Sequence, residues 1–157
     1  MRIADLLDPS RIVADLAART KAEAIRELAE CLARSVSGVS ASSVVEALEL
    51  RERLGPSTGL EHGVAIPHAK VVGLPGIVGC FGRSPQGIEF GAPGGERSQL
   101  FFVLAAPDAP AMLPLHLKAL ARVARVLRNA GVREALLAAE GPDELWRVLC
   151  AADESPP

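Results

Sequence analysis

Aromatic residues are scarce in this chain of 157 residues. They make up 3% of it, as four Phe and one Trp, and Tyr is absent, whereas 49% of the residues are hydrophobic. The core must therefore consist mainly of Leu, Val, Ile and Ala. A core of that size suits one globular domain and is too small for two well-packed ones.

A strong charge of one sign is also lacking, since the formal net charge is -2. Nucleic acids and anionic membranes attract basic surfaces, so this balance argues against both as general partners. No apolar run reaches the roughly 20 residues of a membrane span. The first ten residues include Asp5 and Asp8 and lack the apolar stretch of a signal peptide. We therefore expect a cytoplasmic protein without nucleic-acid partners or direct membrane insertion.

Cysteine is too rare and too widely spaced for a structural framework. Cys31, Cys80 and Cys150 are odd in number and form no CxxC pair, which argues against disulfides and a thiolate zinc site. A GxxxxGK[ST] loop and a protein-kinase signature are also missing, so ATP is not expected as a phosphoryl donor. We expect buried thiols and no cofactor.

The hydrophobic pattern changes twice along the chain. Apolar spacing typical of helices runs from Thr20, which opens a capping box, to about Gly55, and returns after Pro114. Short apolar runs bounded by Gly and Pro lie between them and predict buried strands. This order favours an α/β fold, with a central sheet covered by helices. The predicted strands are residues 63–66, 76–81 and 99–105, residues 84–97 are expected to be irregular, and the predicted inward stripe after Pro114 is Leu117, Leu120, Ala121, Ala124 and Leu127.

Two of the three histidines lie in sequence contexts that are typical of a reactive or anion-binding site. His68 follows Pro67 at the end of the run GVAIP, so we expect it at the margin of the sheet, within reach of a partner. His116 is expected in the first turn of a helix, where free N–H groups favour anions and a neutral imidazole. Ser57, Thr58 and Gly59 offer hydroxyl and backbone N–H groups just before the strand. Simple structural roles, such as a histidine that ends a strand, are an alternative for each of these residues.

The segment from Arg51 to His68 reads RERLGPSTGLEHGVAIPH. It closely resembles the active-site segment of the phosphotransferase-system (PTS) enzyme IIA family of the fructose, mannitol and nitrogen-regulatory type. Residues 115–127, LHLKALARVARVL, resemble the second histidine segment of that family. Looser agreement runs from about Ile3 to Leu149.

This resemblance implies a phosphocarrier of the PEP-dependent sugar phosphotransferase system. His68 would accept a phosphoryl group from HPr or its nitrogen-branch counterpart and pass it to a cysteine of a IIB component. His116 would stabilise the phosphoryl group and the ring, Arg51 would neutralise charge, and Ser57, Thr58, Gly59 and His62 would bind the group. It also implies a mixed central β-sheet with helices on both faces, as one IIA domain over residues 1–152, with residues 153–157 as a disordered tail.

Departures from the family pattern leave alternatives open. Pro56 is an additional residue in the Gly-Ser-Thr-Gly turn, and His62 replaces a small polar residue. One alternative is a nitrogen-regulatory module, in which the phosphorylation state of His68 controls protein partners without sugar transport. A degenerate relative is another, as is a protein in which His62, His68 and His116 converge on zinc.

Overall fold

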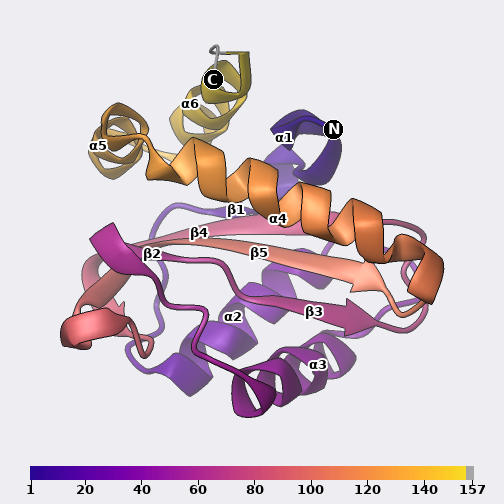
Figure 1. The fold of residues 1–157 in the computed structure, drawn as a ribbon. Helices are drawn as coiled ribbons and strands as arrows, with labels where there is room; N and C mark the ends of the chain where they lie inside the picture. Colours follow the sequence, from indigo (N-terminus) through magenta and orange to yellow (C-terminus); the bar gives the residue numbers. More distant parts are fainter. Residues whose placement is uncertain (155–157) are drawn as a thin grey trace.

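The computed structural model describes residues 1–154, which form a mixed sheet between two layers of helices (Figure 1). Among these residues no helix combines the length and apolarity needed to cross a membrane. The strands are β1 (Ile12–Val13), β2 (Val64–Ala65), β3 (His68–Val71), β4 (Val78–Glu89) and β5 (Arg97–Pro107). The helices are α1 (Ile3–Leu6), α2 (Lys21–Ala33), α3 (Ala41–Leu54), α4 (Leu113–Arg128), α5 (Ala130–Ala138) and α6 (Pro142–Glu154).

The sheet is mixed, as the family resemblance implies. β4 and β5 are antiparallel, β1 runs parallel to β4, and both β2 and β3 run parallel to β5. The pairing of β4 with β5 shifts register between Arg83 and Ile88 but continues to Glu89. The expectation of irregular structure over residues 84–97 was therefore wrong for its first part, because the Pro and Gly there form a bulge within the strand.

Helices cover both faces of the sheet (Figure 1). α2 and α3 pack on one face, where Leu28, Leu32 and Leu48 meet Phe101. α4 crosses the other face, together with α1, α5 and α6, over a core that includes Phe102. The predicted sandwich is confirmed. Cys31 and Cys80 are buried free thiols, as expected, and Cys150 is partly buried.

The inward face of α4 differs from the prediction. His116 is buried with only 5% of its surface exposed, whereas Leu117 is 57% exposed. The helix is thus turned by about one residue, or roughly 100°, from the predicted orientation. Leucines surround the first two turns, so periodicity alone could not select the buried stripe. The buried residues of α4 are His116, Ala119, Val123, Val126 and Leu127.

The chain remains ordered past the predicted boundary at residue 152. Asp153 and Glu154 belong to α6. The Asp153 carboxylate is buried, where it accepts hydrogen bonds from the backbone N–H of Ile3 (2.7 Å) and from Nε of Arg122 (2.6 Å). The predicted tail was therefore wrong at these two residues, because a charged side chain gains partners from α1 and α4. Residues 155–157 lie outside the described part of the chain.

Candidate functional site

His68 lies at an interruption in the edge strand of the sheet. β2 pairs with β5 up to Ala65, and pairing resumes with His68 opposite Leu104. Pro67 lies between them and has no N–H to donate, so the ladder is broken there. His68 is thus the first residue of β3, at the margin of the sheet as predicted. Its side chain is half-buried.

A backbone carbonyl selects the tautomer of His68. Nδ1 of the ring lies 2.9 Å from the carbonyl oxygen of Ile66. A neutral imidazole has one N–H and one lone pair, and a carbonyl oxygen can only accept. Nδ1 therefore carries the proton and donates to Ile66, which leaves the lone pair on Nε2.

Burial lowers the pKa of His68 from its ordinary value, and the charge of Arg51 lowers it further. The hydrogen bond to Ile66 and the carboxylate of Glu52 act in the opposite direction. Because burial is the largest of these effects, the ring is neutral at neutral pH. A neutral ring with a free Nε2 lone pair can act as a nucleophile.

His116 lies beside His68, in the first turn of α4 as predicted. The ring centroids are 5.8 Å apart and the ring planes meet at 79°. Burial lowers the pKa of His116, and the nearby His68 and Lys70 lower it further. Nε2 of His116 is buried and has no hydrogen-bond partner among residues 1–154. A buried polar atom without a partner is costly, so this nitrogen is suited to bind a ligand.

The two rings line a cavity of about 480 Å³ between α3 and α4. Its walls are largely apolar, and Leu54 and Leu117 in them are 75% and 57% exposed. Arg51, in the last turn of α3, lies in the same wall. Exposed leucines around a reactive group are typical of a surface that binds another protein.

Arg51 also lines a smaller, adjoining cavity of about 230 Å³ with His68, Ser57 and Thr58. Its Nη1 donates to the carbonyl oxygen of Pro56 at 3.1 Å. The backbone carbonyl of Pro56 thus holds one N–H group of the guanidinium against the turn. The remaining N–H groups of Arg51 make no other hydrogen bond with residues 1–154, so they can bind an anion.

The Ser57–Thr58 turn is built by its own hydroxyl groups. Ser57 Oγ donates to the carbonyl oxygen of Phe90 at 2.5 Å and accepts from the N–H of Gly59 at 3.0 Å. Thr58 Oγ1 donates to Glu52 at 2.9 Å. A Cβ atom at Gly59 would lie only 2.7 Å from the Phe90 oxygen, so the close approach requires glycine. These groups stabilise the turn, and their role in binding phosphate stays a prediction.

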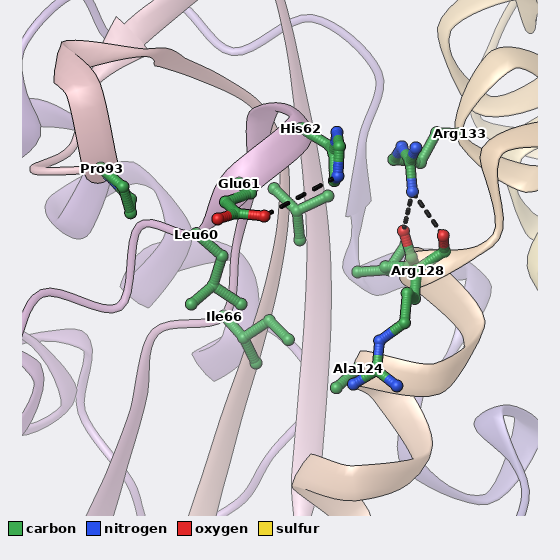
Figure 2. Close-up of a pocket in the computed structure, with 10 residues that line it drawn as sticks. Leu60, Glu61, His62, Ile66, Pro93, Ala124, Arg128 and Arg133 are labelled. Carbon is green, nitrogen blue, oxygen red and sulfur yellow. Dashed lines mark hydrogen bonds and ion pairs between the residues drawn. The ribbon is translucent and has the colours of Figure 1, made fainter.

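His62 lies in a different cavity, of about 460 Å³, whose lining includes neither His68 nor His116. Figure 2 shows His62 on the wall opposite Arg133. Arg133 Nη1 donates to the carbonyl oxygens of Leu127 and Arg128 at the end of α4. The backbone of His62 is left-handed, with φ of 65°. The structure therefore does not bring His62 to the other two histidines.

The zinc alternative is contradicted by this arrangement. Within residues 1–154, no three His, Cys, Asp or Glu side chains form a group that could hold a metal ion. The three histidines are all in that part of the chain, and His62 shares no cavity with His68 or His116.

Glu52 is a residue of the site that the sequence analysis missed. Its side chain is only 6% exposed and forms an ion pair with Lys21 of α2, with Nζ 2.8 Å from Oε1. It accepts the hydrogen bond from Thr58 described above. Glu52 follows Arg51 directly, but adjacent charges are common at the end of a surface helix, so the sequence held no signal that this one is buried.

Comparison with known proteins identifies the family. Residues 5–151 match the family model described as "Phosphoenolpyruvate-dependent sugar phosphotransferase system, EIIA 2". A nitrogen regulatory protein of Bradyrhizobium diazoefficiens is 38% identical over 149 residues, which cover 95% of each chain.

Solved structures agree with this match. The nitrogen regulatory protein IIA-Ntr of Neisseria meningitidis has a TM-score of 0.83 and 34% identity, covering 94% of this chain and 98% of that one. Enzyme IIA of Escherichia coli mannitol transport, in complex with phosphorylated enzyme IIB, has a TM-score of 0.75 and 25% identity, covering 93% and 99%. The chain therefore belongs to the EIIA 2 family of the phosphoenolpyruvate-dependent sugar phosphotransferase system, whose members are phosphotransferase components.

Proposed function

We propose that this chain is a phosphocarrier in which Nε2 of His68 accepts a phosphoryl group from the phosphohistidine of HPr or a nitrogen-branch counterpart. The observation that supports this most is the hydrogen bond from Nδ1 to Ile66, which leaves Nε2 unprotonated. The bond between phosphorus and the donor nitrogen breaks as the bond to Nε2 forms, and its electron pair returns to the donor ring. Such transfers depend mainly on positioning and charge stabilisation.

The same hydrogen bond would support the onward transfer, because it keeps the proton on Nδ1. Once Nε2 is phosphorylated, a ring that keeps its Nδ1 proton carries positive charge, and the Ile66 carbonyl stabilises that charge. The cationic ring is a good leaving group for the onward step. His68 would thus serve equally as acceptor and donor.

Two further groups are placed to stabilise the phosphoryl oxygens. The partnerless Nε2 of His116 is a hydrogen-bond donor when Nδ1 holds the lone pair. Arg51 brings a permanent positive charge and a planar pair of N–H groups, which match two oxygens at once. Positive charge at this position offsets the charge that builds up in transfer.

The apolar cavity around His68 supports a protein as the phosphoryl donor. A carrier that covers Leu54 and Leu117 would bury apolar surface and exclude water from the transferred group. Because attacking and leaving atoms must be in line, donor and acceptor would each have to dock over this same surface.

We propose a IIB component as the acceptor, with its cysteine taking the phosphoryl group before sugar does. The complex of the mannitol IIA relative with phosphorylated IIB supports this choice. The similarity to nitrogen regulatory proteins over nearly the full length supports a second candidate, in which the phosphorylation state of His68 controls protein partners instead.

Intact-protein mass spectrometry at mildly alkaline pH tests the shared first step. The chain is incubated with phosphoenolpyruvate, enzyme I and either HPr or its nitrogen-branch counterpart. We expect one acid-labile phosphoryl group on the wild type and on His62→Ala, and none on His68→Ala. Labelled His68→Ala, or unlabelled wild type beside a carrier proven active, would refute the proposal.

A second experiment separates the two candidates. The phosphorylated chain is mixed with purified IIB components from the same genome. Loss of label from His68 with gain on a IIB cysteine would establish transport. Stable label on His68 with every IIB tested, together with protein partners that bind only one phosphorylation state, would favour regulation.

A further inference from the structure

A continuous series of contacts links α2 to the reactive ring. Lys21 Nζ lies 2.8 Å from Glu52 Oε1, and Thr58 Oγ1 donates to Glu52 Oε2 at 2.9 Å. The carbonyl oxygen of Thr58 accepts from the N–H of Ile66 at 3.0 Å. The carbonyl oxygen of Ile66 accepts from Nδ1 of His68 at 2.9 Å.

Ile66 is the residue of this series that the sheet supports least, because it forms no ladder hydrogen bond with β5. β2 ends at Ala65, and β5 resumes its hydrogen bonds at Pro67, whose carbonyl accepts from the N–H of Leu104. The Ile66 N–H, in the peptide group shared with Ala65, is held by Thr58 rather than by β5. The Ile66 carbonyl belongs to the next peptide group, so Thr58 influences its direction through the backbone position of Ile66. Glu52 binds the Thr58 hydroxyl, and Ser57 and the backbone bond from Leu60 to Val64 hold the same turn.

Glu52 is held firmly enough to act as an anchor. Its side chain is 6% exposed, and its two carboxylate oxygens bind groups from two other elements. The N–H of Thr58 also points at Oε1, at 3.5 Å. A carboxylate at this depth needs such partners, since an unpaired buried charge is strongly unfavourable.

We infer that Glu52, paired with Lys21, is a positioning residue that fixes the ring orientation and tautomer of His68 through Thr58 and Ile66. Glu52 touches neither the ring nor the phosphoryl position, so it acts on the nucleophile at a distance. The inference rests on the proposed role of His68 as phosphoryl acceptor. A reacting group that is misplaced by about 1 Å can lose about 100-fold in rate, so the loss of an orienting residue is expected to be measurable.

Three variants distinguish the hydrogen bond that Glu52 accepts from Thr58 from the negative charge of its carboxylate. Glu52→Ala removes both, Glu52→Gln keeps an oxygen that can accept from Thr58, and Glu46→Ala removes an exposed carboxylate from the same helix. Phosphoramidate is the phosphoryl donor, because a small molecule requires no docking surface. The second readout is the ¹⁵N spectrum of His68, which distinguishes the proton on Nδ1 from the proton on Nε2 without any phosphorylation.

We expect Glu52→Ala to be labelled about tenfold more slowly and to show a mixture of His68 tautomers. Glu52→Gln should recover most of the rate and the Nδ1–H tautomer, and Glu46→Ala should match the wild type. A folded Glu52→Ala protein with wild-type rate and a pure Nδ1–H tautomer would overturn the inference.

Thr58→Val covers the case in which Glu52→Ala does not fold. It keeps the shape of the side chain and removes only the hydroxyl that donates to Glu52, so the same mixture of tautomers is expected. An unchanged tautomer in this variant would also overturn the inference. If the wild type takes no phosphoryl group from any donor, the proposed function fails, while the ¹⁵N readout still decides whether Glu52 positions the ring.

Discussion

The imidazole rings of His68 and His116 meet nearly edge to face, with centroids 5.8 Å apart, although the two residues are 48 positions apart in the sequence. His68 has its Nδ1 bound to a carbonyl, whereas Nε2 of His116 is buried without a partner in the described part of the chain. The hydrogen bond fixes the orientation of the His68 ring, and the neighbouring His116 ring offers a nitrogen, Nε2, that is free to bind a ligand. The two histidines are expected to differ in their response to mutation.

His116→Ala should still accept a phosphoryl group but should pass it on poorly. The nucleophile remains, while one group that stabilises the phosphoryl oxygens is lost, at a cost of about 10²-fold in onward transfer. Quenched-flow transfer from the labelled chain to its acceptor measures this step. Transfer at the wild-type rate would remove His116 from the mechanism.

Arg51→Lys should slow phosphorylation even though the positive charge is kept. Lysine cannot present two parallel N–H groups, and it cannot hold the anchor on the Pro56 carbonyl in the same geometry. We expect a loss of about tenfold in the transfer rate from the phosphorylated carrier. Arg53→Lys, on the same helix and exposed, is the matched control. Equal rates in both variants would make Arg51 a surface charge only.

The phosphorylation rate should be independent of pH above about 7. Burial lowers the pKa of His68 below its ordinary value of about 6.5, so the nucleophile loses its lone pair to a proton only under more acidic conditions. A rate that already falls between about pH 8 and 7 would contradict this shift. A pH series with phosphoramidate as donor measures it directly.

The same shift makes folding stability depend on pH. Between about 6.5 and the lower pKa of the folded state, the unfolded chain binds more protons at His68 and His116 than the folded chain. The contribution of the two neutral histidines to the free energy of unfolding is therefore complete above about pH 6.5. It is lost as the pH falls from about 6.5 through the lower pKa of the folded state. Urea unfolding at several pH values should show a smaller loss in His116→Gln than in the wild type.

Leu117→Asp should impair transfer between proteins without impairing the chemistry. Leu117 is exposed in the wall of the cavity and is placed to contact a docked carrier. A charge there would be desolvated on docking, so KM for the phosphorylated carrier should rise about tenfold. Labelling by phosphoramidate should stay unchanged. Val72→Asp, at an exposed residue outside this cavity, should leave both rates unchanged.

Asp153→Ala should lower the free energy of unfolding by about 2 kcal/mol. It removes two hydrogen bonds of a buried carboxylate and leaves Nε of Arg122 and the N–H of Ile3 without their partner, although Arg122 keeps its bond to the backbone carbonyl of residue 153. Glu134→Ala, at an exposed position of α5, should change stability by less than about 0.5 kcal/mol. Similar urea midpoints for both variants would contradict a structural role for Asp153.

Much of the site was predictable from the sequence because its residues are close along the chain. Arg51, Ser57, Thr58 and His68 fall within one segment, and a turn followed by a short strand necessarily brings them near one another. His116 was predictable from its own segment and from its place in the first turn of a helix. The sandwich followed from the order of helical and strand-like patterns.

Tertiary packing decided which face of α4 is buried and where His62 lies, and sequence periodicity and spacing could not determine either. Leucines surround the first two turns of α4, so only contact with the sheet determined that His116 faces inward and Leu117 outward. His62 is six residues from His68, yet its left-handed backbone places it in another cavity.

The sequence by itself determined the family and the fold class and singled out His68 as the candidate phosphoryl acceptor, because those depend on local patterns. It could not determine which charges are buried. Glu52 and Asp153 look like surface residues, and they are stable inside the protein only because Lys21, Arg122 and backbone N–H groups from distant segments meet them there. Such partners exist only once the chain has folded, so they were visible only in the tertiary structure.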